Sequence, residues 1–158
     1  MPGFGTTDLT KTNSWKLMEQ LGITIRMINI TDACLQHFED IGHKRDSYDV
    51  TYENTQARER TQILMDIANK EGGIVVGTGD MSELALGWCT YNGDHMSMYA
   101  VNVSVPKTLV KYLVRAYAEL HPDVHDTLES ICDTIISPEL LQPDAQGNIA
   151  QPTEEKIG

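Results

Sequence analysis

GTGDMSELALGWCTYNGDHMSMYAVNVSVPKTLVKYL, which runs from Gly77 to Leu113, is the stretch that indicates the fold. A β-branched run, Ile74-Val75-Val76, precedes it directly and predicts a buried strand that ends at Gly77-Thr78-Gly79. Asp80 to Glu83 has the pattern of a helix start, and Pro106-Lys107 has that of a second one. A strand that ends in a glycine turn before helix N-termini is a common way to build an anion-binding crevice.

Outside this stretch, the spacing of apolar residues predicts further strands and helices. Strands are expected at Ile23–Ile30 and Ile74–Val76, and helices at Asp8–Leu21, Thr31–Ile41, Thr51–Glu71, Lys107–Leu120 and, after Pro122, within His121–Ile136. Thr31 is expected to cap its helix with its side chain. The alternation predicts an α/β fold with a parallel sheet flanked by helices.

Composition limits the class of protein. A chain of 158 residues is long enough for one domain with a real core. The net charge of -11 argues against nucleic-acid or anionic-membrane partners, although local donors can still bind a small anion. Three cysteines without a C-x-x-C pattern favour free thiols in a reducing compartment. No signal peptide pattern and no apolar run near about 18 residues are present, so a soluble cytoplasmic protein is expected.

Three residues near the predicted strand end are candidates for binding an anion or a metal. Glu83 follows Asp80 by three residues, so it either forms a capping box or serves as a Mg²⁺-coordinating carboxylate at the crevice. Lys107 follows Pro106 at a helix start, where the helix dipole disfavours a cation. A nearby anion, of which phosphate is the economical choice, would explain this lysine; the alternative is a solvated side chain. Thr78 is either an ordinary strand-end residue or a hydroxyl that faces a ligand.

The helix expected over residues 51–71 carries a polar face. Asn54 and Arg58 are four residues apart and therefore share that face. Tyr48, Tyr52 and Arg58 could bind a nucleotide by stacking and hydrogen bonding. The same pattern also describes a polar helix face with partly buried tyrosines, and residue spacing does not choose between these interpretations.

The glycine-containing loop around residue 93 holds another set of candidates. Asp94 is either a turn residue or a binding residue, and His95 is expected to order the loop. Cys89 lies between Trp88 and Tyr91 on an apparent helix and is expected in the core rather than as a nucleophile. No Ser-His-Asp set is readable, and neither G-x-x-x-x-G-K-[ST] nor G-x-G-x-x-G occurs in the sequence.

Two long segments make a family resemblance specific. YENTQARERTQILMDIAN, followed by GTGDMSELALGWCTYNGDHMSMYAVNVSVPKTLV, closely resembles the synthetase domain of NAD+ synthetase, in particular the glutamine-dependent, two-domain type. MPGFGTT at the start and SPELL…TEEKIG near the end extend the resemblance over nearly the whole chain. It implies a Rossmann-like, adenine nucleotide alpha hydrolase-like sheet and the ATP-dependent amidation of deamido-NAD+ to NAD+. In that reaction ATP adenylates the nicotinate carboxylate, pyrophosphate leaves, and ammonia then displaces AMP.

The resemblance also implies roles for residues on the phosphate side of the site. Glu83 would ligate Mg²⁺ beside the triphosphate, and Lys107 would be a catalytic residue that contacts the ATP phosphates. Ser137 would touch ATP. These roles are chemically reasonable because activation of a carboxylate by ATP requires that charge around the phosphates be neutralised.

On the substrate side, the resemblance implies that Asn54 and Arg58 hold deamido-NAD+. Thr78 and Asp94 would line the side where nicotinate and ammonia meet, with Asp94 as a catalytic residue. Ammonia would come from glutamine through a glutaminase domain that the sequence does not contain.

The departures from the family predict a partial domain. The family's phosphate-binding motif, S-G-G-x-D-S, does not occur, so residues 1–136 are expected to form a synthetase domain incomplete at its N-terminus. Residues 137–158 are expected to be a flexible tail of that domain. The isolated chain is expected to be nearly inactive. Without its first strand the sheet is expected to have an exposed edge, which favours self-association, and the resemblance to homo-oligomeric family members also implies a homo-oligomer. The alternatives are a non-catalytic nucleotide-binding module, another ATP-pyrophosphatase ligase or amidotransferase, and a purely structural fragment.

Overall fold

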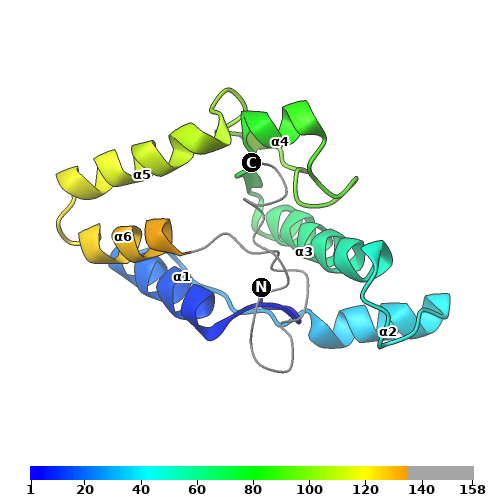
Figure 1. Ribbon diagram of the computed structural model, residues 1–158. Helices are drawn as coiled ribbons and strands as arrows, with labels where there is room; N and C mark the ends of the chain where they lie inside the picture. The colour runs from blue at the N-terminus through cyan, green and yellow to red at the C-terminus, as the bar shows by residue number, and fades with distance from the viewer. Residues whose placement is uncertain (135–158) are drawn as a thin grey trace. The chain divides into compact units, whose positions relative to one another are not determined.

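The computed structural model describes residues 1–134, which form helices and one pair of short strands (Figure 1). The elements are α1 (Asp8–Gln20), α2 (Thr31–Ile41), α3 (Val50–Glu71), β1 (Val76–Gly77), α4 (Met81–Leu86), β2 (Tyr99–Ala100), α5 (Lys107–Leu120) and α6 (His125–Asp133). Two compact units share them, one formed by Ile30–Val110 and the other by Met1–Asn29 with the described residues from Lys111 on. Within residues 1–134, no helix has the length and apolar character needed to cross a membrane.

The parallel pair of β1 and β2 confirms the predicted α/β class. Val76 is paired with Tyr99 and Gly77 with Ala100, and α4 lies in the connection between the two strands. Gly77 has no room for a side chain, because a Cβ atom at that position would lie 2.6 Å from Cβ of Ser97, in the loop before β2. The connection between β1 and β2, residues 78–98, lies within the stretch from Gly77 to Leu113 that indicated the fold.

The strand expected at Ile23–Ile30 is wrong, and β2 was not expected. The buried strand expected at Ile74–Val76 is only partly correct, because β1 covers Val76–Gly77 and of the three residues only Val75 is buried. Ile23–Ile30 is irregular backbone, and β1 and β2 are the paired strands among the residues that the structure describes. A strand exists through hydrogen bonds to a neighbour, and alternation of residue types cannot supply that neighbour. Ile30 is fully buried, whereas Ile23 and Met27 are half exposed, so one end of the segment packs into the core.

Local capping explains where the helices of the larger unit begin and end. The side chain of Asp49 caps α3, and Gly72, with a φ of 66°, ends it in the left-handed region that favours glycine. The expected cap of α2 is wrong: Ile30 occupies the N-cap position, and no side-chain hydrogen bond caps this end. The chain reaches α2 through buried Ile30, so burial of this side chain accompanies the helix start.

The core of this unit lies between α2 and α3, which are adjacent in Figure 1. Phe38 of α2 stacks on Tyr52 of α3 with ring centroids 5.7 Å apart, and Tyr48 meets Tyr52 edge-on at 5.0 Å. Tyr52 is only 2% exposed, so it is a core residue and not a stacking platform for a nucleotide. Cys34 and Gln56 are fully buried in the same unit.

In the other unit, α1 packs on α6, and α5 contributes to the same small core. Ala118, Val124 and Leu128 are buried there, with Leu17 and Val114 packed against them. Polar contacts join the same elements: Asn13 Nδ2 donates to Ser130 Oγ at 3.0 Å, Gln20 Nε2 donates to the Asp123 carbonyl at 2.8 Å, and Arg115 pairs with Glu129 and Asp133. Arg115 thus ties α5 to α6 rather than extending freely into solvent.

Asp49 makes the stability of the α3 start dependent on pH. Its pKa falls from 3.8 to about 2, chiefly because its carboxylate accepts a hydrogen bond from the Tyr52 amide and another from the His43 ring. Burial opposes this shift, and smaller contributions from Ser47 and Thr51 add to it. A lowered pKa means that the stabilisation is present above pH 3.8 and is lost as the pH falls towards 2.

We therefore expect Asp49→Asn, which keeps an oxygen acceptor but cannot titrate, to flatten part of the acid dependence of stability. The free energy of unfolding, from urea titrations of both proteins at several pH values, should differ most above pH 3.8 and converge towards pH 2. Parallel curves over this range would show that the Asp49 carboxylate does not stabilise the fold.

Candidate functional site

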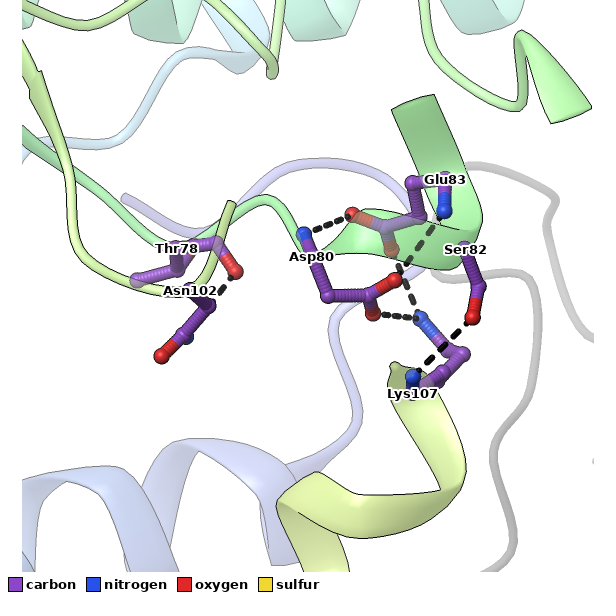
Figure 2. A network of polar contacts seen from close by, with 6 residues as sticks. All are labelled: Thr78, Asp80, Ser82, Glu83, Asn102 and Lys107. Atoms are coloured by element: carbon purple, nitrogen blue, oxygen red, sulfur yellow. Dashed lines mark hydrogen bonds and ion pairs between the residues drawn. The ribbon is translucent and has the colours of Figure 1, made fainter. Parts of the chain in front are cut away.

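The N-terminus of α4 carries a capping box directly after the glycine turn of β1 (Figure 2). Asp80 Oδ1 accepts from the Glu83 amide at 3.0 Å, and Glu83 Oε2 accepts from the Asp80 amide at 3.1 Å. Asp80 is 4% exposed, and the Glu83 side chain is 27% exposed. The capping interpretation of Glu83 is confirmed, and its second carboxylate oxygen points towards α5.

Lys107, the first residue of α5, lies between these two carboxylates (Figure 2). Its Nζ is 2.6 Å from Glu83 Oε1 and 3.3 Å from Asp80 Oδ2, and its amide donates to Ser82 Oγ at 3.0 Å. A further bond, from the Met81 amide to the Val105 carbonyl, joins the same segments. The sequence suggested that an anion neighbours Lys107, and in the structure two carboxylates of α4 take this place.

This arrangement keeps Lys107 positively charged. Burial lowers the pKa of its ammonium group, but the hydrogen bond and charge of Glu83, together with Asp80, outweigh burial and raise the pKa. The three side chains have a formal charge of -1 together. The cluster of Asp80, Glu83 and Lys107, called here the lysine cluster, therefore holds a cation at a helix start without presenting net positive charge.

Thr78 lies just before this cluster, on the turn that follows β1. Its backbone carbonyl accepts a hydrogen bond of 3.4 Å from Asn102 Nδ2, which joins the turn to the segment after β2 (Figure 2). Thr78 is exposed. The structure thus places Thr78 beside the lysine cluster, and a role for its hydroxyl stays a prediction.

A second polar cluster joins α3 to the loop between α4 and β2. Thr90 Oγ1 donates to Asn54 Oδ1 at 2.8 Å, the Thr90 amide donates to Asp94 Oδ1 at 2.8 Å, and His95 Nδ1 lies 2.9 Å from the Thr90 carbonyl. Arg58 Nε donates to the Tyr91 carbonyl at 3.0 Å. We call Asn54, Thr90, Asp94 and His95 the threonine cluster.

Sequence reasoning selected Asn54, Arg58 and Asp94 but missed Thr90, which links Asn54 to Asp94. The available signal was Asn92-Gly93, a turn dipeptide next to a residue that can hydrogen-bond through both side chain and backbone. Asn92 has a φ of 56° and Gly93 is buried, so the turn is tight. Loop residues that bond to a helix are invisible to periodicity, because the contact is set by the path of the loop.

Cys89 does not lie on a helix, contrary to expectation, because α4 ends at Leu86 with Gly87 as its C-cap. Its side chain is half-buried rather than in the core. Burial and the charges of Asp94 and Glu83 raise the pKa of its thiol, which disfavours the nucleophilic thiolate. The interpretation that Cys89 is not a nucleophile agrees with this environment.

The described residues do not form a complete metal site by themselves. No group of three or more His, Cys, Asp or Glu side chains with the geometry to hold a metal ion occurs within residues 1–134. Asp80 and Glu83 supply oxygen ligands, the kind that Mg²⁺ prefers, and Mg²⁺ commonly takes one or two carboxylates together with phosphate and water oxygens. The pair therefore suits a shared metal position rather than a protein cage. Ser137 lies outside the described residues.

A parallel strand pair, a glycine turn and two joined helix N-termini define an α/β protein of the kind that presents a polar site beyond its strand ends. The family model described as NAD synthase matches residues 1–141. The chain belongs to the NAD synthase family.

Individual relatives agree with this assignment. The glutamine-dependent NAD(+) synthetase of Mycobacterium leprae is 47% identical over 100% of this chain, and that of Thermotoga maritima is 37% identical over 74% of it. The chain spans 24% of the length of the M. leprae relative and 21% of the T. maritima one. It therefore corresponds to about a quarter of such a protein.

Solved structures support the fold. The chain superposes on a glutamine-dependent NAD+ synthetase from Acinetobacter baumannii, solved in complex with ADP, with a TM-score of 0.77 and 28% identity, covering 86% of this chain and 26% of that one. An NMN synthetase from Francisella tularensis gives a TM-score of 0.79 at 23% identity, covering 98% and 58%. The second likeness concerns the fold alone.

The raised pKa of Lys107 predicts an alkaline loss of stability. The stabilisation from the lysine cluster is fully present below pH 10.5, the ordinary value, and is lost as the pH rises through the higher pKa in the folded protein. We expect Lys107→Met to reduce the free energy of unfolding at pH 8, and this reduction to shrink above pH 10.5. Urea titrations of both proteins from pH 8 upward measure the difference, with Lys111→Met as a control. A difference that did not change above pH 10.5 would mean that charge at Lys107 is not the stabilising factor.

Proposed function

We propose that this chain forms part of an NAD+ synthetase, which amidates deamido-NAD+ to NAD+ with consumption of ATP. The observation that carries the proposal is the 47% identity with a glutamine-dependent NAD(+) synthetase over the full chain. The nitrogen would come as ammonia, released from glutamine by a separate glutaminase domain. The lysine cluster and the threonine cluster supply two chemically different regions, as a reaction between a triphosphate and a carboxylate requires.

The reaction proceeds in two steps. The nicotinate carboxylate oxygen attacks the α-phosphorus of ATP, a P–O bond forms, and the bond to pyrophosphate breaks. Ammonia then attacks the activated carbonyl carbon, the C–N bond forms, AMP leaves with the C–O bonding electrons, and the nitrogen loses a proton. Both steps develop negative charge on phosphate oxygens, so the protein must neutralise charge there.

Lys107 and Glu83 are proposed to bind the phosphate side. Lys107 would donate from Nζ to a phosphate oxygen, as an alternative to its contacts with Glu83 and Asp80. Because the lysine cluster has a formal charge of -1, it would not attract a triphosphate by itself. Glu83 would hold Mg²⁺ together with phosphate oxygens, and the metal would supply the missing positive charge. Ser137 is proposed as a further contact of ATP.

The substrate side is proposed to involve α3 and the loop that carries the threonine cluster. Asn54 and Arg58, one turn apart on α3, would hold deamido-NAD+. Asp94 and Thr78 would line the region where nicotinate meets ammonia, and Asp94 would accept a proton from the attacking nitrogen. Asp94 and Thr78 are exposed, and the Asn54 side chain is half-buried, so none is sealed inside the core.

The surroundings of this function are proposed as well. Cys34, Cys89 and Cys132 are all free, which fits a reducing cytoplasm.

Assembly into a homo-oligomer is proposed because the synthetases that the sequence resembles assemble in this way. Sedimentation velocity of the 158-residue chain over a range of concentrations tests the assembly, and a monomer at all concentrations contradicts it for this chain.

Binding of the two substrates to the chain tests the proposal. We expect calorimetric titration to show deamido-NAD+ binding and Mg²⁺-dependent ATP binding. Lys107→Met and Glu83→Gln should each weaken ATP binding about tenfold or more, since each removes a charge-assisted contact worth about 1.5–3 kcal/mol. Lys111→Met is the matched control, because it removes the same charge from the same helix one turn later.

The outcomes separate the alternatives. Binding of both nucleotides, with ATP binding lost in Lys107→Met but kept in Lys111→Met, supports the proposal. Binding of ATP without deamido-NAD+ would favour a non-catalytic nucleotide-binding module. Binding of neither would contradict the proposal for this chain.

A further inference from the structure

Thr90 makes hydrogen bonds to four residues, and two of these residues, Asn54 and Asp94, are proposed to contact substrate. Its hydroxyl donates to Asn54, its amide donates to Asp94, and its carbonyl lies within hydrogen-bond distance of His95 Nδ1. Thr90 itself is 8% exposed, so it lies beneath the surface on which Asn54 and Asp94 stand. We propose that Thr90 is a positioning residue that sets the Asn54 side chain and the Asp94 carboxylate for deamido-NAD+. This inference rests on the proposed function.

The hydroxyl of Thr90 fixes how the Asn54 amide is oriented. Because Thr90 Oγ1 donates to Asn54 Oδ1 at 2.8 Å, the carbonyl end of the Asn54 amide faces the loop. The Nδ2 end then carries two N–H donors that are directed away from Thr90. An oxygen-rich substrate such as a dinucleotide offers acceptors for such donors. Without the hydroxyl, the amide can rotate, and the cost of ordering it falls on ligand binding.

The backbone of Thr90 fixes the other side of the loop. Asp94 Oδ1 accepts from the Thr90 amide, so rotation of the carboxylate is restricted while Oδ2 is directed elsewhere. The Gly93 amide also donates to the Thr90 carbonyl at 2.9 Å, which closes the turn. The two hydrogen bonds of the Thr90 backbone, to Asp94 and to Gly93, therefore hold the loop in the conformation that positions Asp94.

The methyl group of Thr90 fills the space under Gly93. A Cβ atom added at Gly93 would lie 2.8 Å from Thr90 Cβ and 2.9 Å from its Cγ2, closer than real Cβ contacts allow. Both branches of the Thr90 side chain thus make contacts. The methyl group packs against the turn, and the hydroxyl group bonds to Asn54 of α3. Valine keeps the shape but lacks the hydroxyl, and serine keeps the hydroxyl but lacks the methyl, so the two substitutions separate the functions.

Arg58 reinforces the same connection one turn further along α3. Its Nε donates to the carbonyl of Tyr91, the residue after Thr90. Asn54 and Arg58 lie four residues apart on one face of α3, so two successive loop residues contact two successive positions of that face. These two contacts therefore hold the loop against one face of α3. Of the two loop residues, Thr90 is buried and Tyr91 is exposed.

The experiment compares Thr90→Val, Thr90→Ser, Asn54→Ala and the Thr90→Val/Asn54→Ala double variant of the 158-residue chain by calorimetric titration. We expect Thr90→Val to weaken deamido-NAD+ binding about tenfold and to leave Mg²⁺-dependent ATP binding unchanged. Thr90→Ser should recover most of the lost affinity. In the Asn54→Ala background, Thr90→Val should cause little further loss, because the hydroxyl acts through Asn54.

A readout without ligand makes the positioning claim independent of substrate binding. Amide hydrogen exchange of Thr90 and Gly93, followed by NMR, should become about tenfold faster in Thr90→Val and stay near the wild-type rate in Thr90→Ser. Unchanged exchange in Thr90→Val would overturn the claim that the hydroxyl anchors the loop. An equal loss of ATP and deamido-NAD+ affinity in Thr90→Val would overturn the positioning role, because a residue that only stabilises the fold would affect both ligands alike.

The same data distinguish failure of this inference from failure of the proposed function. If the wild-type chain binds no deamido-NAD+, the proposed function fails and the substrate role of Thr90 is overturned with it. The amide exchange rates still test whether the Thr90 hydroxyl anchors the loop. If the wild-type chain binds and Thr90→Val binds equally well, the proposed function stands and the positioning role is overturned.

Discussion

The site depends on the ion pairs that the ammonium group of Lys107 makes with the carboxylates of Glu83 and Asp80. A lysine at the first position of a helix meets the positive end of the helix dipole, which is unfavourable unless negative charge lies nearby. Here that charge belongs to the capping box of α4. The residues that satisfy the amides at one helix start thereby also neutralise the cation at another. The N-termini of α4 and α5 are joined by this shared set of charges and by the bond from the Lys107 amide to Ser82.

The sharing has a consequence for ligand binding. Each oxygen of Glu83 already has a partner, the Asp80 amide on one side and Lys107 on the other. A carboxylate oxygen can accept more than one bond, so a metal ion is chemically acceptable there without loss of the cap. A phosphate that approaches Lys107 competes with two carboxylates and needs added positive charge. The geometry of the lysine cluster therefore supports the proposal that nucleotide and metal bind there together.

The sequence predicted the parts of this region whose causes are local. The starts of α4 and α5 follow from Asp80, Glu83 and Pro106, and the end of α3 follows from Gly72, because caps are set by residues within one turn. The pairing of β1 with β2 was out of reach, since a strand of two residues leaves no periodic signal. The expected strand at Ile23–Ile30 failed for the converse reason: it has the pattern without the partner. Tyr52 could not be assigned from spacing, because an aromatic ring on a helix suits both a ligand and a core.

Thr90 shows the limit most clearly. Its importance comes from a loop folding back on a helix 36 residues earlier in the chain, and from a turn so tight that Gly93 has no room for a side chain. The family resemblance selected Asn54 and Asp94 because it implies direct contact with substrate, which is the role proposed for them. A residue that only holds such groups in place is identified by its burial and by its bonds, both of which require coordinates. The lysine cluster can be proposed from charge and capping rules, but the threonine cluster follows only from the path of the chain.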